Sequence, residues 1–165
     1  MPGFCSSLRT AQLEGVRHDY IKLSNIIHRG ENVYFTDFSS SIWFGVSQET
    51  STESPATATI LYAAPESFQA GDGSPQRHGT KTDVYSLGMV YVEMLTVLHG
   101  STIDDLREYV NGVNGSVEGS RTKQYHRVAE YFEEWFVPRS GVTMYLTCIQ
   151  PMPRAEQDDR PQKEC

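Results

Sequence analysis

The stretch RHDYIKLSNII, residues 17–27, gathers a histidine, an aspartate, a lysine and an asparagine between apolar neighbours. Such side chains can transfer a proton, neutralise a phosphate or bind a cation, and in a polar loop they can also simply face solvent. A further aspartate, Asp37, follows a short way along the chain. Because Mg²⁺ prefers oxygen ligands and keeps several waters, one carboxylate and one amide oxygen form a suitable pair of ligands.

Residues 25–37 predict a tight β-hairpin that positions two of these side chains. The runs NIIH and VYFT favour strands, and RGEN between them is typical of a turn. An antiparallel hairpin returns to its starting edge. Asn25, which enters the first strand, and Asp37, which leaves the second, are therefore expected to lie near each other.

The segment VYSLGMVYVEMLTVL, residues 84–98, is apolar on nearly all sides. This pattern is typical of a helix buried in the middle of a domain. Thr82 or Asp83 would cap its start, and Gly100 suits its end.

The remaining elements are loops and further helices. Residues 39–59 are rich in Ser, Thr and small residues without a sustained period, which predicts a long loop. NGVNGSVEGS, residues 111–120, predicts a flexible linker. The other expected elements are a loop at 69–81 and helices at about 124–137 and 140–150. The fold class that follows is α+β and mainly α-helical.

Composition excludes several classes of function. The chain has 165 residues, 38% of them hydrophobic, which suits one domain or a piece of a larger one. A net charge of −7 argues against a nucleic-acid binder, which would need a basic face. The three cysteines form no CxxC pair, so we expect a reduced intracellular protein, cytoplasmic or nuclear, without a zinc site. The longest apolar stretch is too short for a bilayer of about 30 Å, so no membrane association is expected.

Five landmarks in order resemble the C-terminal lobe of a eukaryotic protein kinase of the Ser/Thr type. The family's catalytic loop has the form H-R-D-L/I-K-x-x-N, and its later signatures are D-F-G, A-P-E, a D-V-x-S-x-G helix and a closing R-P. The corresponding stretches here are HDYIKLSN within 17–27, D-F-S at 37–39, A-P-E at 64–66, TDVYSLG with Asp83, and Arg160-Pro161.

The resemblance implies that residues 1–165 are a partial kinase domain. In it, 39–63 is the activation loop and 83–98 the central helix. Only residues 1–17 precede the catalytic-loop histidine. The family's small lobe, with its Gly-rich loop, strand lysine and most of the adenine pocket, would therefore be missing.

The implied activity is ATP-dependent phosphorylation of protein Ser or Thr, with ATP and Mg²⁺ as cofactors. Asp37 would hold the metal that bridges the phosphates, Asn25 a second metal, and Lys22 would contact the transferred phosphate. Lysine at this spacing resembles the Ser/Thr-specific branch. Whether the chain alone binds nucleotide is left open.

Four further residues have implied structural roles. His18 is expected to be a packed loop histidine rather than a base. Asp83 would anchor the backbone of the catalytic loop, and it could also cap the helix that follows. Glu66 and Arg160 would form a buried ion pair.

The catalytic loop departs from the family pattern where the proton acceptor belongs. Lys22 and Asn25 set the register, and the catalytic aspartate position then holds Tyr20. A tyrosine with a pKa of about 10 is a protonated donor near neutral pH. Asp19, one residue early, occupies the family's arginine position and is a poor substitute. Ser39 replaces a glycine, so a flip of this segment would be restricted.

Three interpretations follow. The chain is a kinase domain fragment whose activity is lost, or a pseudokinase-like interaction module without catalysis, or a truncated product without function. Its partner would be a protein substrate or protein ligand, with a small-lobe segment or another chain covering an exposed apolar face. Ser54-Pro55 is a candidate phosphorylation site, although a Ser/Thr-rich loop at 46–59 explains the composition as well.

Overall fold

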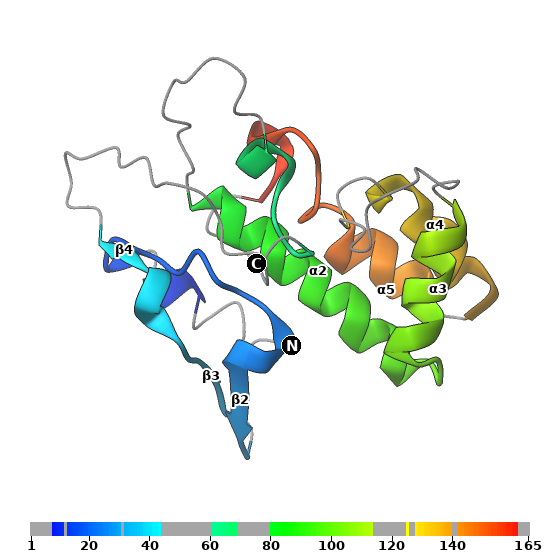
Figure 1. Ribbon diagram of the computed structural model, residues 1–165, viewed down its shortest axis with the longest axis horizontal. Coiled ribbons are helices and arrows are strands. Elements are labelled where there is room, and N and C mark those ends of the chain that lie inside the picture. Colours follow the sequence, from blue (N-terminus) through cyan, green and yellow to red (C-terminus); the bar gives the residue numbers. More distant parts are fainter. Residues whose placement is uncertain are drawn as a thin grey trace.

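A computed structural model gives the arrangement of most of the chain. It describes residues 8–11, 13–30, 32–43, 61–68, 80–113, 125, 128–139 and 142–161. A central helix, α2, separates a β-hairpin from a group of shorter helices (Figure 1). The described residues form mostly helices, with two small two-stranded antiparallel sheets, so the mainly helical α+β prediction is confirmed.

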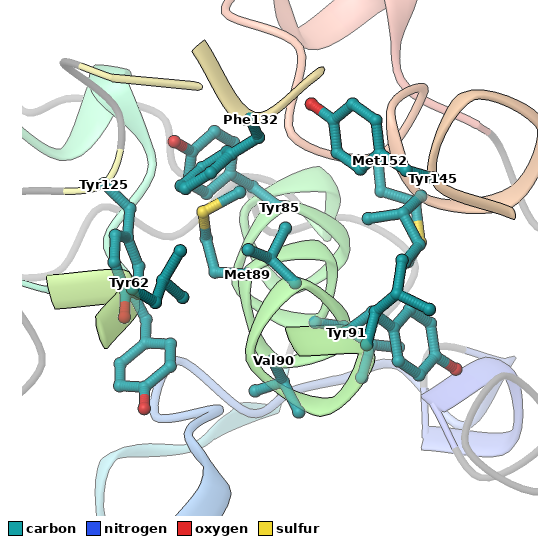
Figure 2. Close-up of a cluster of buried hydrophobic side chains, with 14 of the residues drawn as sticks. Tyr62, Tyr85, Met89, Val90, Tyr91, Tyr125, Phe132, Tyr145 and Met152 are labelled. Carbon is teal, nitrogen blue, oxygen red and sulfur yellow. The ribbon is translucent and has the colours of Figure 1, made fainter. Parts of the chain in front are cut away.

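Helix α2, Lys81–Leu98, is the axis of the core. Most of its residues are buried, and Tyr85, Met89, Val90 and Tyr91 leave it in different directions (Figure 2). This confirms the buried helix, which begins slightly earlier than predicted. The helix ends at Leu98, and Gly100 just beyond it lies in the left-handed region at φ +83°, as expected after a helix terminus.

The predicted cap of α2 is wrong. The N-cap residue is Thr80, and no side chain caps it. Thr82 and Asp83 lie inside the helix. Asp83 is instead bonded to the backbone of a distant loop, which a local capping rule does not anticipate.

Gly88 lets the C-terminal segment approach α2 closely. A Cβ added there would lie 2.9 Å from the Cβ of Met152 and 3.1 Å from the Cδ of Pro153. We expect Gly88→Ala to lower the free energy of unfolding by about 1–3 kcal/mol, because neither neighbour is the flexible end of a side chain. Urea denaturation measures the change. Gly112→Ala is the matched control, since a Cβ there meets nothing within 4 Å, and a helical alanine is favoured over glycine. Equal losses in both variants would contradict this packing.

The predicted hairpin is confirmed. Strand β2, Ile26–Arg29, pairs antiparallel with β3, Asn32–Phe35, and Ile26 lies opposite Phe35. Gly30 takes a φ of +61° in the turn, which suits a residue without a Cβ.

A second small sheet was not predicted. Strand β1, Val16–Arg17, pairs with β4, Ile42–Trp43. The 3-10 turn η2, Phe38–Ser40, comes directly before β4 in the chain. Two-residue strands carry no readable period, so β4 falls within the stretch 39–59 that the sequence predicts as a loop. Residues 44–60 of the predicted activation loop, including Ser54-Pro55, lie outside the described residues.

Helix α3, Ile103–Val113, was missed, and it includes the first residues of the predicted linker 111–120. Its start is a reciprocal capping box. The Thr102 amide donates to Asp105 Oδ2 at 2.7 Å, and the Asp105 amide donates to Thr102 Oγ1 at 3.1 Å. The T-x-x-D spacing was therefore a readable signal. Residues 114–120 of the predicted linker lie outside the described residues. Of the predicted loop 69–81, residues 69–79 also lie outside them, and Lys81 belongs to α2 instead.

The two helices predicted near the C-terminus are broken into shorter pieces. They are η6 (Ala129–Tyr131), α4 (Phe132–Phe136), η7 (Val137–Arg139), α5 (Val142–Met144) and the π-helical turn η8 (Tyr145–Ile149). A further 3-10 turn, η9 (Gln157–Asp159), follows where no helix was predicted. Both α3 and η8 pack on α2. Within the described ranges, no helix is both long and apolar enough to cross a membrane.

Candidate functional site

Asp83 anchors the catalytic loop from inside α2. Its Oδ2 accepts the amide of His18 at 2.8 Å, and its Oδ1 accepts the amide of Asp19 at 2.9 Å. The side chain is almost fully buried, and burial raises the pKa of Asp83 to about 7, although the two amide hydrogen bonds act in the opposite direction. The contact that the family resemblance implied for this residue is present.

His18 is a packed loop histidine with both ring nitrogens in use. Its Nδ1 accepts the Tyr20 amide at 3.3 Å, so the proton lies on Nε2, which donates to the Thr36 carbonyl at 3.0 Å. The ring contacts Phe35 and Phe38, and burial lowers its pKa below the usual value. A neutral imidazole committed on both sides holds the loop together and has no free nitrogen for a base.

The hairpin brings Asn25 and Asp37 together, as its topology predicted. Asn25 ends the 3-10 turn η1, Leu23–Asn25, and the Thr36 amide donates to its carbonyl at 2.8 Å, which closes the base of the hairpin. The Asn25 Nδ2 donates to the Tyr20 carbonyl at 2.9 Å and lies 3.5 Å from Asp37 Oδ2. The side-chain oxygen, Oδ1, accepts the Ser24 hydroxyl at 3.5 Å and has a second lone pair that could bind a cation.

Asp37 is an exposed carboxylate at the start of η2. Ser39 Oγ donates to its Oδ1 at 2.7 Å. The pKa of Asp37 is lowered chiefly by this hydroxyl, and also by the Ser39 amide and the nearby charge of Lys22. An ionised, exposed carboxylate is the kind of oxygen ligand that Mg²⁺ prefers. The described residues contain no group of three or more His, Cys, Asp or Glu that could form an all-protein metal cage, and Mg²⁺ commonly binds through few side chains together with phosphates.

Lys22 lies over the ring of Tyr20. Its Nζ is 3.9 Å from the ring centroid, a cation–π contact. Sequence reasoning placed both residues in the site and missed their stacking. The residue that replaces the expected proton acceptor thus also contacts the lysine expected to bind phosphate.

Asp19 forms an ion pair with Arg17. The Nε of Arg17 lies 2.7 Å from its Oδ1, and both side chains are largely buried. The backbone of Asp19 has a φ of +59°, which is uncommon for a residue other than glycine. The Asp19 amide donates to Asp83, so both the backbone and the side chain of Asp19 are held by neighbouring residues.

Glu66 and Arg160 form the expected ion pair. Glu66 lies in the 3-10 turn η4, Pro65–Phe68, and Arg160 near the C-terminus of the described chain. The two guanidinium NH groups of Arg160 reach the carboxylate oxygens at 2.6 and 2.8 Å. The Arg160 side chain is fully buried.

The family model for the protein kinase domain matches residues 3–130. Because this match spans well over half of the 165 residues, the chain belongs to the protein kinase family, whose members are transferases that generally use ATP and Mg²⁺. The resemblance to eukaryotic protein kinases is confirmed. Arg160 lies beyond the matched residues, yet its bond to Glu66 ties that segment to the same domain.

Proposed function

We propose that this chain is the large lobe of a Ser/Thr-type protein kinase domain that has lost phosphoryl transfer and kept the cation- and phosphate-binding side of the site. The observation that carries the proposal is Tyr20. It occupies the position of the proton acceptor, and its carbonyl accepts the amide of Asn25. The ancestral reaction is transfer of the ATP γ-phosphate to a serine or threonine hydroxyl.

Loss of the base is a large loss of rate. General-base assistance contributes about 10²–10⁴-fold. A tyrosine hydroxyl with a pKa of about 10 stays protonated near neutral pH and cannot accept the proton of the substrate. The neighbouring carboxylate of Asp19 is paired with Arg17, which supports the view that no other loop residue replaces the base.

The remaining side chains fit a Mg²⁺-bound phosphate. Asp37 and the Oδ1 of Asn25 would hold the cation, and Lys22 would contact the phosphate as a positive charge. When bound, Mg²⁺ neutralises charge on the phosphates. The residues themselves only position and orient: the tyrosine carbonyl fixes the Asn25 amide, and Ser39 contacts the aspartate.

We expect the purified chain to bind Mn²⁺, a probe for Mg²⁺, in a saturable way that Asp37→Ala removes. Titration followed by electron paramagnetic resonance reports free Mn²⁺ directly. Asp104→Ala is the control, because this exposed aspartate in α3 lies in a different part of the fold. Binding that is absent in the wild type, or unchanged in Asp37→Ala, contradicts the cation role of Asp37.

A non-catalytic binding role is the second candidate, favoured by an exposed apolar pair on the hairpin. Ile27 and Tyr34 lie opposite each other on β2 and β3 and are 54% and 47% exposed. An exposed apolar pair of this kind favours a binding surface that a small-lobe segment or another protein chain would cover. Under this function, partner binding would survive the Asp37→Ala change.

A further inference from the structure

We propose that Ser39 is a positioning residue whose hydroxyl holds the Asp37 carboxylate in the orientation that binds the cation. The inference rests on the cation role proposed above for Asp37. Ser39 stands where the family pattern has a glycine, which has no side chain to make this contact. The departure at this position therefore adds an interaction instead of only removing backbone freedom.

The backbone of Asp37 needs support from its neighbours. It has φ 62° and ψ 64°, in the left-handed region that residues other than glycine rarely occupy. Such a conformation persists only when surrounding contacts determine it. The shortest of these side-chain contacts is the 2.7 Å bond from Ser39 Oγ to Asp37 Oδ1, a length typical of a hydroxyl donating to an ionised carboxylate.

The turn that carries Ser39 is itself fixed to the catalytic loop. Ser41 Oγ donates to the His18 carbonyl at 3.1 Å, and the Ser41 amide donates to the Phe38 carbonyl at 3.0 Å. Beyond it, β4 pairs with β1. Since η2 is held at its end, Ser39 can impose an orientation on the aspartate rather than follow it.

The hydroxyl and the cation can use different oxygens of the carboxylate. Ser39 Oγ donates to Oδ1 at 2.7 Å, whereas Oδ2 accepts the longer hydrogen bond from Asn25 Nδ2 at 3.5 Å. An ionised carboxylate has about four lone-pair sites, so these two hydrogen bonds still leave a lone pair on Oδ2 for a cation. Hydrogen bonds to a ligating carboxylate orient it, and their loss typically lowers metal affinity about 10–100-fold.

The experiment compares four variants of the whole chain by Mn²⁺ titration. We expect Ser39→Ala and Ser39→Gly to weaken Mn²⁺ binding about 10-fold. Ser39→Thr keeps the hydroxyl and should keep the affinity of the wild type. Ser40→Ala, in the same exposed turn, is the matched control and should change nothing. Unchanged or tighter binding in Ser39→Ala overturns the proposal.

A second readout needs no metal. Three-bond NMR couplings of the Asp37 β-protons should report one χ1 rotamer in the wild type and Ser39→Thr, and averaged rotamers in Ser39→Ala and Ser39→Gly. A single rotamer retained in Ser39→Ala overturns the positioning role, whatever the metal affinity. A wild-type chain that binds no Mn²⁺ instead overturns the cation role of Asp37, and the couplings then decide separately whether Ser39 orients the aspartate.

Discussion

Replacing Arg160 by alanine is expected to lower the free energy of unfolding by about 3–5 kcal/mol, the usual cost of removing one partner of a buried ion pair. The Glu66 carboxylate, only 13% exposed, would lose both of its bonds to the guanidinium. Three backbone carbonyls would also lose their donor: those of Lys81, Arg154 and Ala155, now 3.2, 2.6 and 2.9 Å from guanidinium nitrogens. One side chain therefore joins η4, the start of α2 and the C-terminal segment.

Urea denaturation with matched variants separates this effect from simple loss of charge. Arg107→Ala is the control, because its pair with Asp104 is exposed at 3.4 Å and should contribute less than about 1 kcal/mol. Arg160→Lys keeps the charge and loses the forked geometry, so we expect an intermediate loss. If Arg160→Ala costs no more than Arg107→Ala, the bridge does not hold these segments together.

Glu93→Ala is expected to be about as damaging, at about 3–5 kcal/mol, because each buried hydroxyl left without its acceptor costs about 1–3 kcal/mol. Glu93 is fully buried in α2 and accepts the hydroxyls of Tyr62 and Tyr125, each at 2.6 Å. The two rings meet edge to face beside α2 (Figure 2). The truncation would also leave a cavity where the side chain now packs.

Glu93→Gln tests whether hydrogen bonding explains the loss. Its amide keeps the shape, with an oxygen to accept one tyrosine hydroxyl and an NH₂ to donate to the other, so we expect a loss of about 1 kcal/mol. Thermal and urea unfolding of the two variants give the comparison. Equal losses for alanine and glutamine would show that the carboxylate charge matters more than the satisfied hydroxyls.

Strong local patterns made part of the fold predictable. The hairpin carried a turn signal between two β-prone runs, and α2 carried an unbroken apolar run. The anchoring role of Asp83 was implied by the family resemblance and by no local pattern, since a helix-capping rule looks a few residues ahead while its partner His18 lies 65 positions away. Helix α3 was missed although Thr102 and Asp105 had the spacing of a capping box.

The candidate site was likewise predictable only in part. The closeness of Asn25 and Asp37 follows from the topology of an antiparallel hairpin, so residue order alone predicted it. The bond from Ser39 to Asp37 and the stacking of Lys22 on Tyr20 depend on backbone angles and rotamers. Periodicity and spacing do not encode these two contacts, so only the folded structure shows them.

Phosphoryl transfer tests the proposed loss of catalysis most directly. The whole chain is incubated with Mg²⁺ and ATP labelled in the γ-phosphate, with a serine- and threonine-containing protein as acceptor, beside the Asp37→Ala variant. Because Tyr20 stands in the place of the proton acceptor, we expect label incorporation by the wild type to equal that of Asp37→Ala. Incorporation by the wild type that Asp37→Ala abolishes would show that this kinase domain is active and that the proposed loss of catalysis is wrong.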